Sequence, residues 1–95
     1  MGYSFEKEHG LYIVDIVEEV VGDGKTVMLD LVTFSSDKTD GGHLILTDIN
    51  DNVVVDIWGA KNNTKVLPFP KPRKMNGLKV SKIDTGKACI YLAQP

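Results

Sequence analysis

A chain of 95 residues with 42% apolar and 25% charged residues has the size and composition of one folded domain, not of a disordered protein. No apolar run is long enough to span a membrane, and the first residues are too polar for a secretory signal. A single cysteine, Cys89, excludes a disulfide within the chain. We therefore expect a protein of a reducing interior that is not secreted through a signal peptide.

The net charge of −2 hides an uneven distribution. Residues 1–48 carry 3 Lys and 10 Asp or Glu, for a charge of −7, whereas residues 49–95 carry 8 Lys or Arg and 3 Asp, for +5. Two interpretations stay open. The charges could solvate strand faces that interleave in the fold, or they could form opposite patches that orient contacts between subunits.

Residues 1–9 are expected to form an N-terminal arm, followed by a single domain in residues 10–95. The arm carries Tyr3 and Phe5 among charged residues and has no apolar period. In a monomer these aromatics would face water, whereas a neighbouring chain could bury them. Deleting the arm should then leave a folded domain that cannot assemble.

The domain opens with two expected strands, Leu11–Val21 and Thr26–Phe34, which are rich in β-branched residues. Gly22-Asp23-Gly24 between them predicts a hairpin turn, because these residues tolerate positive φ angles. The second strand alternates, with Leu31 on its apolar face, and an exposed loop at residues 35–42 follows.

A central hairpin is expected from Leu44–Thr47 and Val53–Trp58, joined by the turn-forming residues 48–52. The alternation places Val53, Val55 and Ile57 on one face and Val54, Asp56 and Trp58 on the other. A strand with apolar residues on both faces needs cover on both sides. This predicts a place near the middle of the sheet, with Trp58 anchored in the core.

The second half supplies further short segments. Lys65–Phe69 predicts a strand, and the prolines of Pro68–Lys74 place that run at a sheet edge or outside the sheet. Asn76-Gly77 is expected to begin a last hairpin with strands Leu78–Ile83 and Lys87–Ala93.

About seven short antiparallel strands predict an all-β protein, built as a single-domain β-sandwich or jelly-roll-like barrel. Replacing Leu31 with Ala should then cost about 2–4 kcal/mol by leaving a cavity. The core is predicted from the apolar phase of the strands, and its members are Trp58, Val55, Leu29, Leu31, Leu78, Val80, Ile90 and Leu92.

Asp48–Asn52 resembles the start of a calcium loop, because four of its five residues carry oxygen ligands. Val53 stands where an EF-hand needs Gly, and Gly59 stands where its bidentate Glu belongs. The run also matches the letters DxNDN of cadherin linkers, but Val54 and Val55 replace the proline expected there. A plain hairpin turn is the better account, and we expect no metal and no cofactor.

His9 and His43 are the two histidines, the residue type that most often transfers protons at neutral pH, and neither has a partner at metal-ligand spacing. The loop at residues 35–40 carries Ser and Asp without the spacing of a nucleophile elbow or a phosphate loop. Cys89 lies mid-strand and is expected to be a buried, inert thiol. We expect no enzyme, since catalysis would need His43 and an acid of this loop to meet in a cleft.

Basic residues cluster after Phe69. Nucleic-acid binding is one reading, but the domain is net acidic and carries no RNA- or DNA-binding signature. A Lys- and Pro-bearing edge that prevents sheet-to-sheet aggregation is the preferred reading. The candidate partner-binding residues, from the arm and from this run, are Tyr3, Phe5, Phe69, Lys71, Arg73 and Lys74.

The second half of the chain resembles a known family. Its order is a hairpin, a proline-bearing connector, Asn76-Gly77-Leu78-Lys79-Val80 and a closing Gly86…Ile90-Tyr91-Leu92. Over residues 43–95 this is similar to small all-β virion proteins of tailed bacteriophages, whose last strands often read G-L-x-V … G-x-x-x-I-Y-L. The resemblance implies a structural role in many copies, decorating a capsid or joining head, connector or tail parts.

Two functions of different classes follow. The first is a non-enzymatic assembly protein of a phage particle, in the virion or the host cytoplasm, that contacts its own copies or other virion proteins and has no small-molecule substrate. The alternative is a ligand-binding β module for carbohydrate or peptide that uses Trp58 and tyrosines as a stacking platform. Such a module needs two or more aromatics on one open face, whereas the core prediction buries Trp58.

Overall fold

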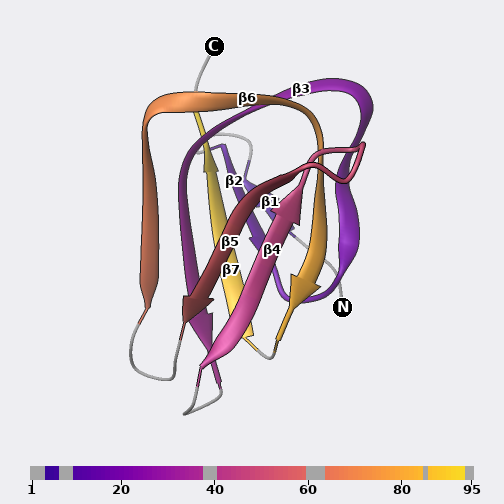
Figure 1. Ribbon diagram of the computed structural model, residues 1–95. Coiled ribbons are helices and arrows are strands. Elements are labelled where there is room, and N and C mark those ends of the chain that lie inside the picture. Colours follow the sequence, from indigo (N-terminus) through magenta and orange to yellow (C-terminus); the bar gives the residue numbers. More distant parts are fainter. Residues whose placement is uncertain (1–3, 7–9, 38–40, 60–63, 85, 94–95) are drawn as a thin grey trace.

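The computed structural model describes residues 4–6, 10–37, 41–59, 64–84 and 86–93, and within these ranges every regular element is a β-strand (Figure 1). The predicted all-β class is confirmed. None of the described residues belongs to a helix with the length and apolar character of a membrane span. The strands are β1 (Ser4–Glu6), β2 (Leu11–Val14), β3 (Glu18–Ser36), β4 (Gly42–Thr47), β5 (Val53–Gly59), β6 (Lys65–Ile83) and β7 (Gly86–Leu92).

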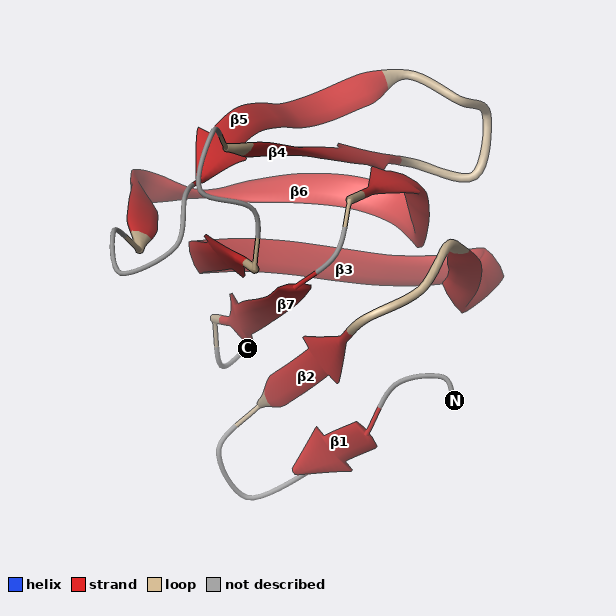
Figure 2. Cartoon of the chain, turned by 90° about the horizontal axis from the view of Figure 1, so that it is seen from below, coloured by secondary structure: helices blue, strands red, loops and turns tan. Residues whose placement is uncertain are grey.

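These strands form one antiparallel sheet in the order β1-β2-β7-β3-β6-β4-β5 (Figure 2). β1 and β5 lie at opposite edges and do not pair with each other, so the sheet is open. The predicted sandwich or jelly-roll barrel is therefore not confirmed. β5, predicted near the middle of the sheet, is an edge strand, because apolar alternation identifies a strand without identifying its neighbours.

β3 and β6 are each 19 residues long and pair with each other along most of their length. Both continue through segments predicted as turns, Gly22-Asp23-Gly24 in β3 and Asn76-Gly77 in β6. Gly24 and Gly77 have φ angles of 84° and 70°, and the Gly24 N–H donates to Asn76 Oδ1 at 2.8 Å. These residues bend the strand pair over one end of the molecule instead of reversing the chain (Figure 1). The prediction of uniformly short strands is wrong at both places.

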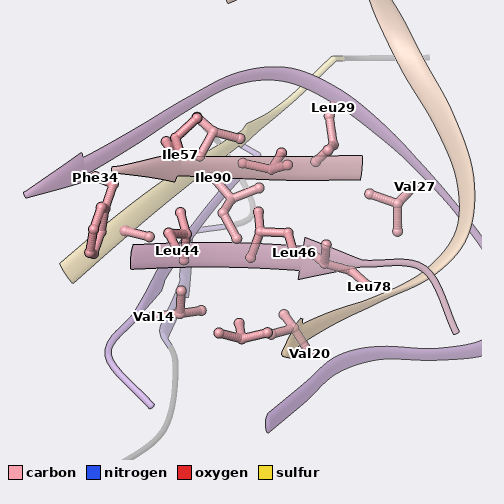
Figure 3. Packing of buried hydrophobic residues seen from close by; sticks show 14 of the residues in the cluster. Val14, Val20, Val27, Leu29, Phe34, Leu44, Leu46, Ile57, Leu78 and Ile90 are labelled. Atoms are coloured by element: carbon pink, nitrogen blue, oxygen red, sulfur yellow. The ribbon is translucent and has the colours of Figure 1, made fainter. Parts of the chain in front are cut away.

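The bent sheet brings the β4–β5 hairpin over β3 and β7, and the core fills the space between them (Figures 1 and 3). Its buried apolar residues are Val14, Val20, Val27, Leu29, Val32, Phe34, Leu44, Leu46, Val55, Ile57, Met75, Leu78, Val80, Ala88 and Ile90. The predicted core members Leu29, Val55, Leu78, Val80 and Ile90 are confirmed. Leu92 is half-buried and packs against this core. Leu31 is half-buried and Trp58 is exposed, so the core prediction is wrong for these two.

A β-bulge in β3 accounts for Leu31. Between Leu29 and Leu31 the register advances two residues on β3 but only one on β7. The buried residues are Leu29 before this step and Val32 and Phe34 after it, so the apolar phase moves from odd to even numbers. The alternation read from the sequence holds only on one side of the bulge.

A second bulge changes the phase of β5. The step from Val53 to Val55 corresponds to one residue of β4. Val54 consequently packs against the core, whereas Val53 is 56% exposed, the reverse of the predicted faces. Beyond the bulge the alternation is regular, and Trp58 falls on the outer face opposite to Val55.

The acidic and basic halves of the chain lie side by side, because β3 pairs with β6. Glu19, of the acidic half, is directly opposite Lys79, of the basic half. At these positions the opposite charges interleave, which agrees with the first interpretation of the charge distribution.

Part of the predicted arm belongs to the sheet. β1 pairs with β2 and places Ser4 opposite Ile13 and Glu6 opposite Leu11. Tyr3 and His9 lie outside the described residues, and only the backbone of Phe5 is described.

Candidate interaction surface

The outer face of the β4–β5 hairpin carries an aromatic pair. His43 of β4 lies opposite Trp58 of β5, and their rings stack with centroids 4.1 Å apart and an interplanar angle of 7°. Trp58, the single tryptophan, is 60% exposed, whereas the His43 side chain is only 13% exposed. One face of the indole is thus covered by the imidazole, while much of the ring remains open to solvent.

Two carboxylates hold His43 in position. Its Nε2 is hydrogen-bonded to Oδ1 of Asp56. Its backbone N–H donates to Asp84 Oδ2 at 2.9 Å, and the Asp84 N–H donates to the His43 carbonyl at 3.0 Å. Asp84 directly follows β6, so it ties this end of the hairpin to the rest of the sheet. The aromatic pair therefore has a fixed support, which limits the entropy lost when a partner binds.

Sequence reasoning missed this cluster. It predicted a buried Trp58 and a strand that begins at Leu44, whereas β4 begins at Gly42 and includes His43. Counting outward from the turn at residues 48–52 would have placed His43 opposite Ile57, because the bulge between Val53 and Val55 shifts the register by one residue. No local pattern points to Asp84, because its contact with His43 joins residues 41 positions apart.

β5 also presents an open strand edge next to the aromatic pair. The strand has seven residues and is last in the sheet order, so within the described structure only β4 pairs with it (Figure 2). It contains no Pro, Lys or Arg. Unpaired N–H and C=O groups along such an edge can pair with another extended chain.

The predicted partner-binding residues do not lie on neighbouring strands. Phe5 is on β1, at the opposite edge from β5, whereas the other described members are on β6. Phe69 is partly buried and packs against the core. The exposed members are Lys71, Arg73 and Lys74.

The side chain of Asp48 organises the turn between β4 and β5. Its Oδ1 accepts hydrogen bonds from the N–H groups of Asn50 and Asn52 at 2.8 and 3.0 Å, and its Oδ2 accepts one from Asn52 Nδ2 at 3.0 Å. These bonds, led by that of the Asn52 side chain, lower the pKa of the Asp48 carboxyl because they stabilise its charged form. Both oxygens of the Asp48 carboxylate therefore accept hydrogen bonds within the turn, as in a plain hairpin turn. Across the described ranges, no three His, Cys, Asp or Glu are grouped as ligands for a metal.

A catalytic arrangement was expected to need His43 beside an acid of residues 35–40, and the observed partner of the His43 ring is a different acid. The acid bonded to the His43 ring is Asp56 of β5, on a strand face. An open hollow of about 580 Å³ lies elsewhere, lined by Asp15, Ser35, Asp37, Gly86 and Lys87. Cys89, predicted to be buried, is partly exposed, because Ala88 and Ile90 hold the core phase of β7.

Comparison of the chain with protein-family models, with curated proteins and with solved structures gives no match. The function is therefore inferred from the surface itself. Its main features are an exposed tryptophan on a fixed support and a strand edge without a partner.

Proposed function

We propose that the protein is a non-enzymatic structural or assembly component that acts through contacts with other protein chains. The observation that carries the proposal is Trp58, which is exposed on the edge strand β5 and held by His43. Tryptophan is among the residues that contribute most to protein–protein binding when they are buried at an interface. The adjacent open edge offers backbone hydrogen bonds to the same partner.

The resemblance of residues 43–95 to small all-β virion proteins of tailed bacteriophages supports a place in a phage particle. The partners would then be other copies of the chain or other virion proteins, and the role capsid decoration or the joining of head and tail parts. The protein would be found in the virion or the host cytoplasm, and its function would involve no membrane, nucleic acid, cofactor or small-molecule substrate.

Native mass measurement tests this proposal. Protein isolated from its source under native conditions should be part of a species heavier than one chain, and Trp58→Ala should release it while the circular dichroism of the domain stays unchanged. Val66→Ala is the matched control, because Val66 is a 52% exposed apolar side chain on another strand. A chain that is monomeric in every fraction and binds no component of the particle would contradict the proposal.

A ligand-binding module for carbohydrate or peptide is the second candidate, and the exposure of Trp58 favours it. A sugar ring could stack on the open indole while Asp56 accepts hydrogen bonds from its hydroxyl groups. Because the chain has one tryptophan, its fluorescence would report this binding directly. Emission that does not change with millimolar mono- and oligosaccharides, in a protein that does associate with other chains, favours the assembly role.

A further inference from the structure

The open edges of the sheet differ in how they are protected against pairing. Within the described residues, β4 pairs with β6 only at Leu44–Thr47 against Lys79–Ile83. In the run Pro68–Lys74, the end residues Pro68, Arg73 and Lys74 pair with β3, and no described strand pairs with the other side of the run. That run carries three prolines and three cations, which block the approach of another strand. β1 has only three residues. β5 is longer and contains no proline and no cationic residue that would block another strand. It also leaves Trp58 exposed beside its edge.

We propose that β5 pairs antiparallel with β5 of a second copy around a twofold axis at Ile57, so that one sheet continues through a dimer. The inference rests on the proposed function, because it names the partner of the same surface. A twofold contact uses one edge from each subunit and closes, so it leaves no free β5 edge for further growth. The guarded edge of β6 then keeps the dimer from aggregating.

The position of the axis follows from regularity and charge. The part of β5 beyond its bulge, Val55–Gly59, pairs regularly with β4 and has Ile57 at its centre. With the axis there, Asp56 lies opposite Trp58 of the second copy. An axis one residue earlier would place the two Asp56 carboxylates directly opposite each other, which is repulsive.

This register gives the exposed groups of β5 partners. The indole of Trp58 would lie beside Asp56 of the second copy, where its N–H can donate to the carboxylate. The two Trp58 rings would be diagonal neighbours across the axis, a spacing that aromatic side chains can bridge. β5, which pairs only with β4 within the described residues, would gain a second strand partner at the same time.

Sedimentation and tryptophan emission over a wide concentration range test the dimer. The intact protein should change from one chain to two as its concentration rises, and its emission should move to shorter wavelength over the same range. Trp58→Lys should weaken dimerisation on the order of tenfold or more, because it removes the central aromatic and adds a cation at the edge. Val66→Lys, which also introduces a lysine at a comparably exposed site but on β6, should leave dimerisation unchanged.

Cysteine cross-linking tests the register in a Cys89→Ser background, which removes the single natural thiol. A mixture of Asp56→Cys and Trp58→Cys chains should form the mixed disulfide, since these positions are opposite each other. Asp56→Cys alone should cross-link poorly. Preferential coupling of Asp56→Cys with itself would overturn the register proposed here.

The outcomes separate this inference from the proposed function. A protein that is monomeric at all concentrations, or whose dimer tolerates Trp58→Lys, overturns β5 pairing, and binding to other components of a particle would still support the assembly role. A dimer that dissociates with Trp58→Lys but persists in Val66→Lys supports β5 pairing. Folding of each variant is checked by its thermal transition before association is measured.

Discussion

Trp58 and Leu31 illustrate how the position of a single residue depends on the phase of its strand. Each was predicted in the core from its apolar character. In the structure, neither residue occupies the face of its strand that points into the core. Trp58 follows the outer phase of β5, and Leu31 falls out of phase at the β3 bulge. The exposed tryptophan then becomes available for binding, whereas Phe34 takes the buried position in β3.

At this scale we expect Phe34→Ala to cost about 3–5 kcal/mol of the free energy of unfolding, because it leaves a large cavity among fully buried neighbours. Leu31→Ala should cost only about 1 kcal/mol, since the half-buried side chain leaves no closed cavity. Denaturant unfolding of the two variants measures both values. A loss at Leu31 as large as that at Phe34 would show that the phase of β3 is not the one described.

The turn residue Asp48 should make stability depend on acid. Hydrogen bonds from Asn52 and Asn50 lower its pKa in the folded protein, so its contribution is complete above the ordinary pKa of Asp and is lost as the pH falls below about 4. The difference in unfolding free energy between the intact protein and Asp48→Ala should therefore shrink on acidification. Asn50→Ala is the control, because it keeps the backbone N–H of residue 50 that bonds to Asp48. Its difference in unfolding free energy from the intact protein should not shrink on acidification.

At the scale of elements, glycines stand where a strand begins and where a strand bends, for different physical reasons. Gly86 starts β7 against the end of β3, with a φ angle of 145°. A Cβ at this position would lie 2.1 Å from Ser35 O and 2.7 Å from Ser36 Cα, both of them backbone atoms. Gly24, in the bend of β3, also has a positive φ, but a Cβ there would meet nothing within 4 Å.

Replacing each glycine with alanine separates steric contact from backbone strain. Gly86→Ala should cost about 3 kcal/mol or more, because β7 has to shift away from β3 and the backbone is strained as well. Gly24→Ala should cost only about 1 kcal/mol, the strain alone. Thermal unfolding of both variants measures the difference. Equal losses would mean that the β3–β7 contact at Gly86 is looser than described.

At the scale of the whole molecule, the two ends of the sheet order are separate candidates for association. β1 lies at one edge and β5 at the other (Figure 2). The N-terminal residues were predicted to mediate assembly, whereas the exposed tryptophan and the unguarded edge are on β5. Because these edges are distinct, variants can test them independently.

Deletion of residues 1–9 should leave the domain folded and β5-mediated dimerisation unchanged, since it removes only β1 from the opposite edge. Sedimentation of the intact and truncated proteins at equal concentration measures this. If truncation abolishes association while Trp58→Lys does not, the arm and not β5 is the contact.

Local chemistry in the sequence determined much of this protein. The β-branched, alternating segments became strands, residues 48–52 became the β4–β5 turn, and the proline-bearing run kept an open side. Each of these depends on neighbours within a few residues, so the letters alone indicate it.

Only the tertiary structure decided which strands pair, where the bulges interrupt the alternation, and that β5 lies at an edge. These features depend on contacts between distant residues, such as Asp84 with His43 and β3 with β6. A single bulge reverses the face of every residue beyond it, so no local alternation could predict that Leu31 leaves the core. For the same reason the exposed pair of Trp58 and His43 emerged only once the sheet was assembled.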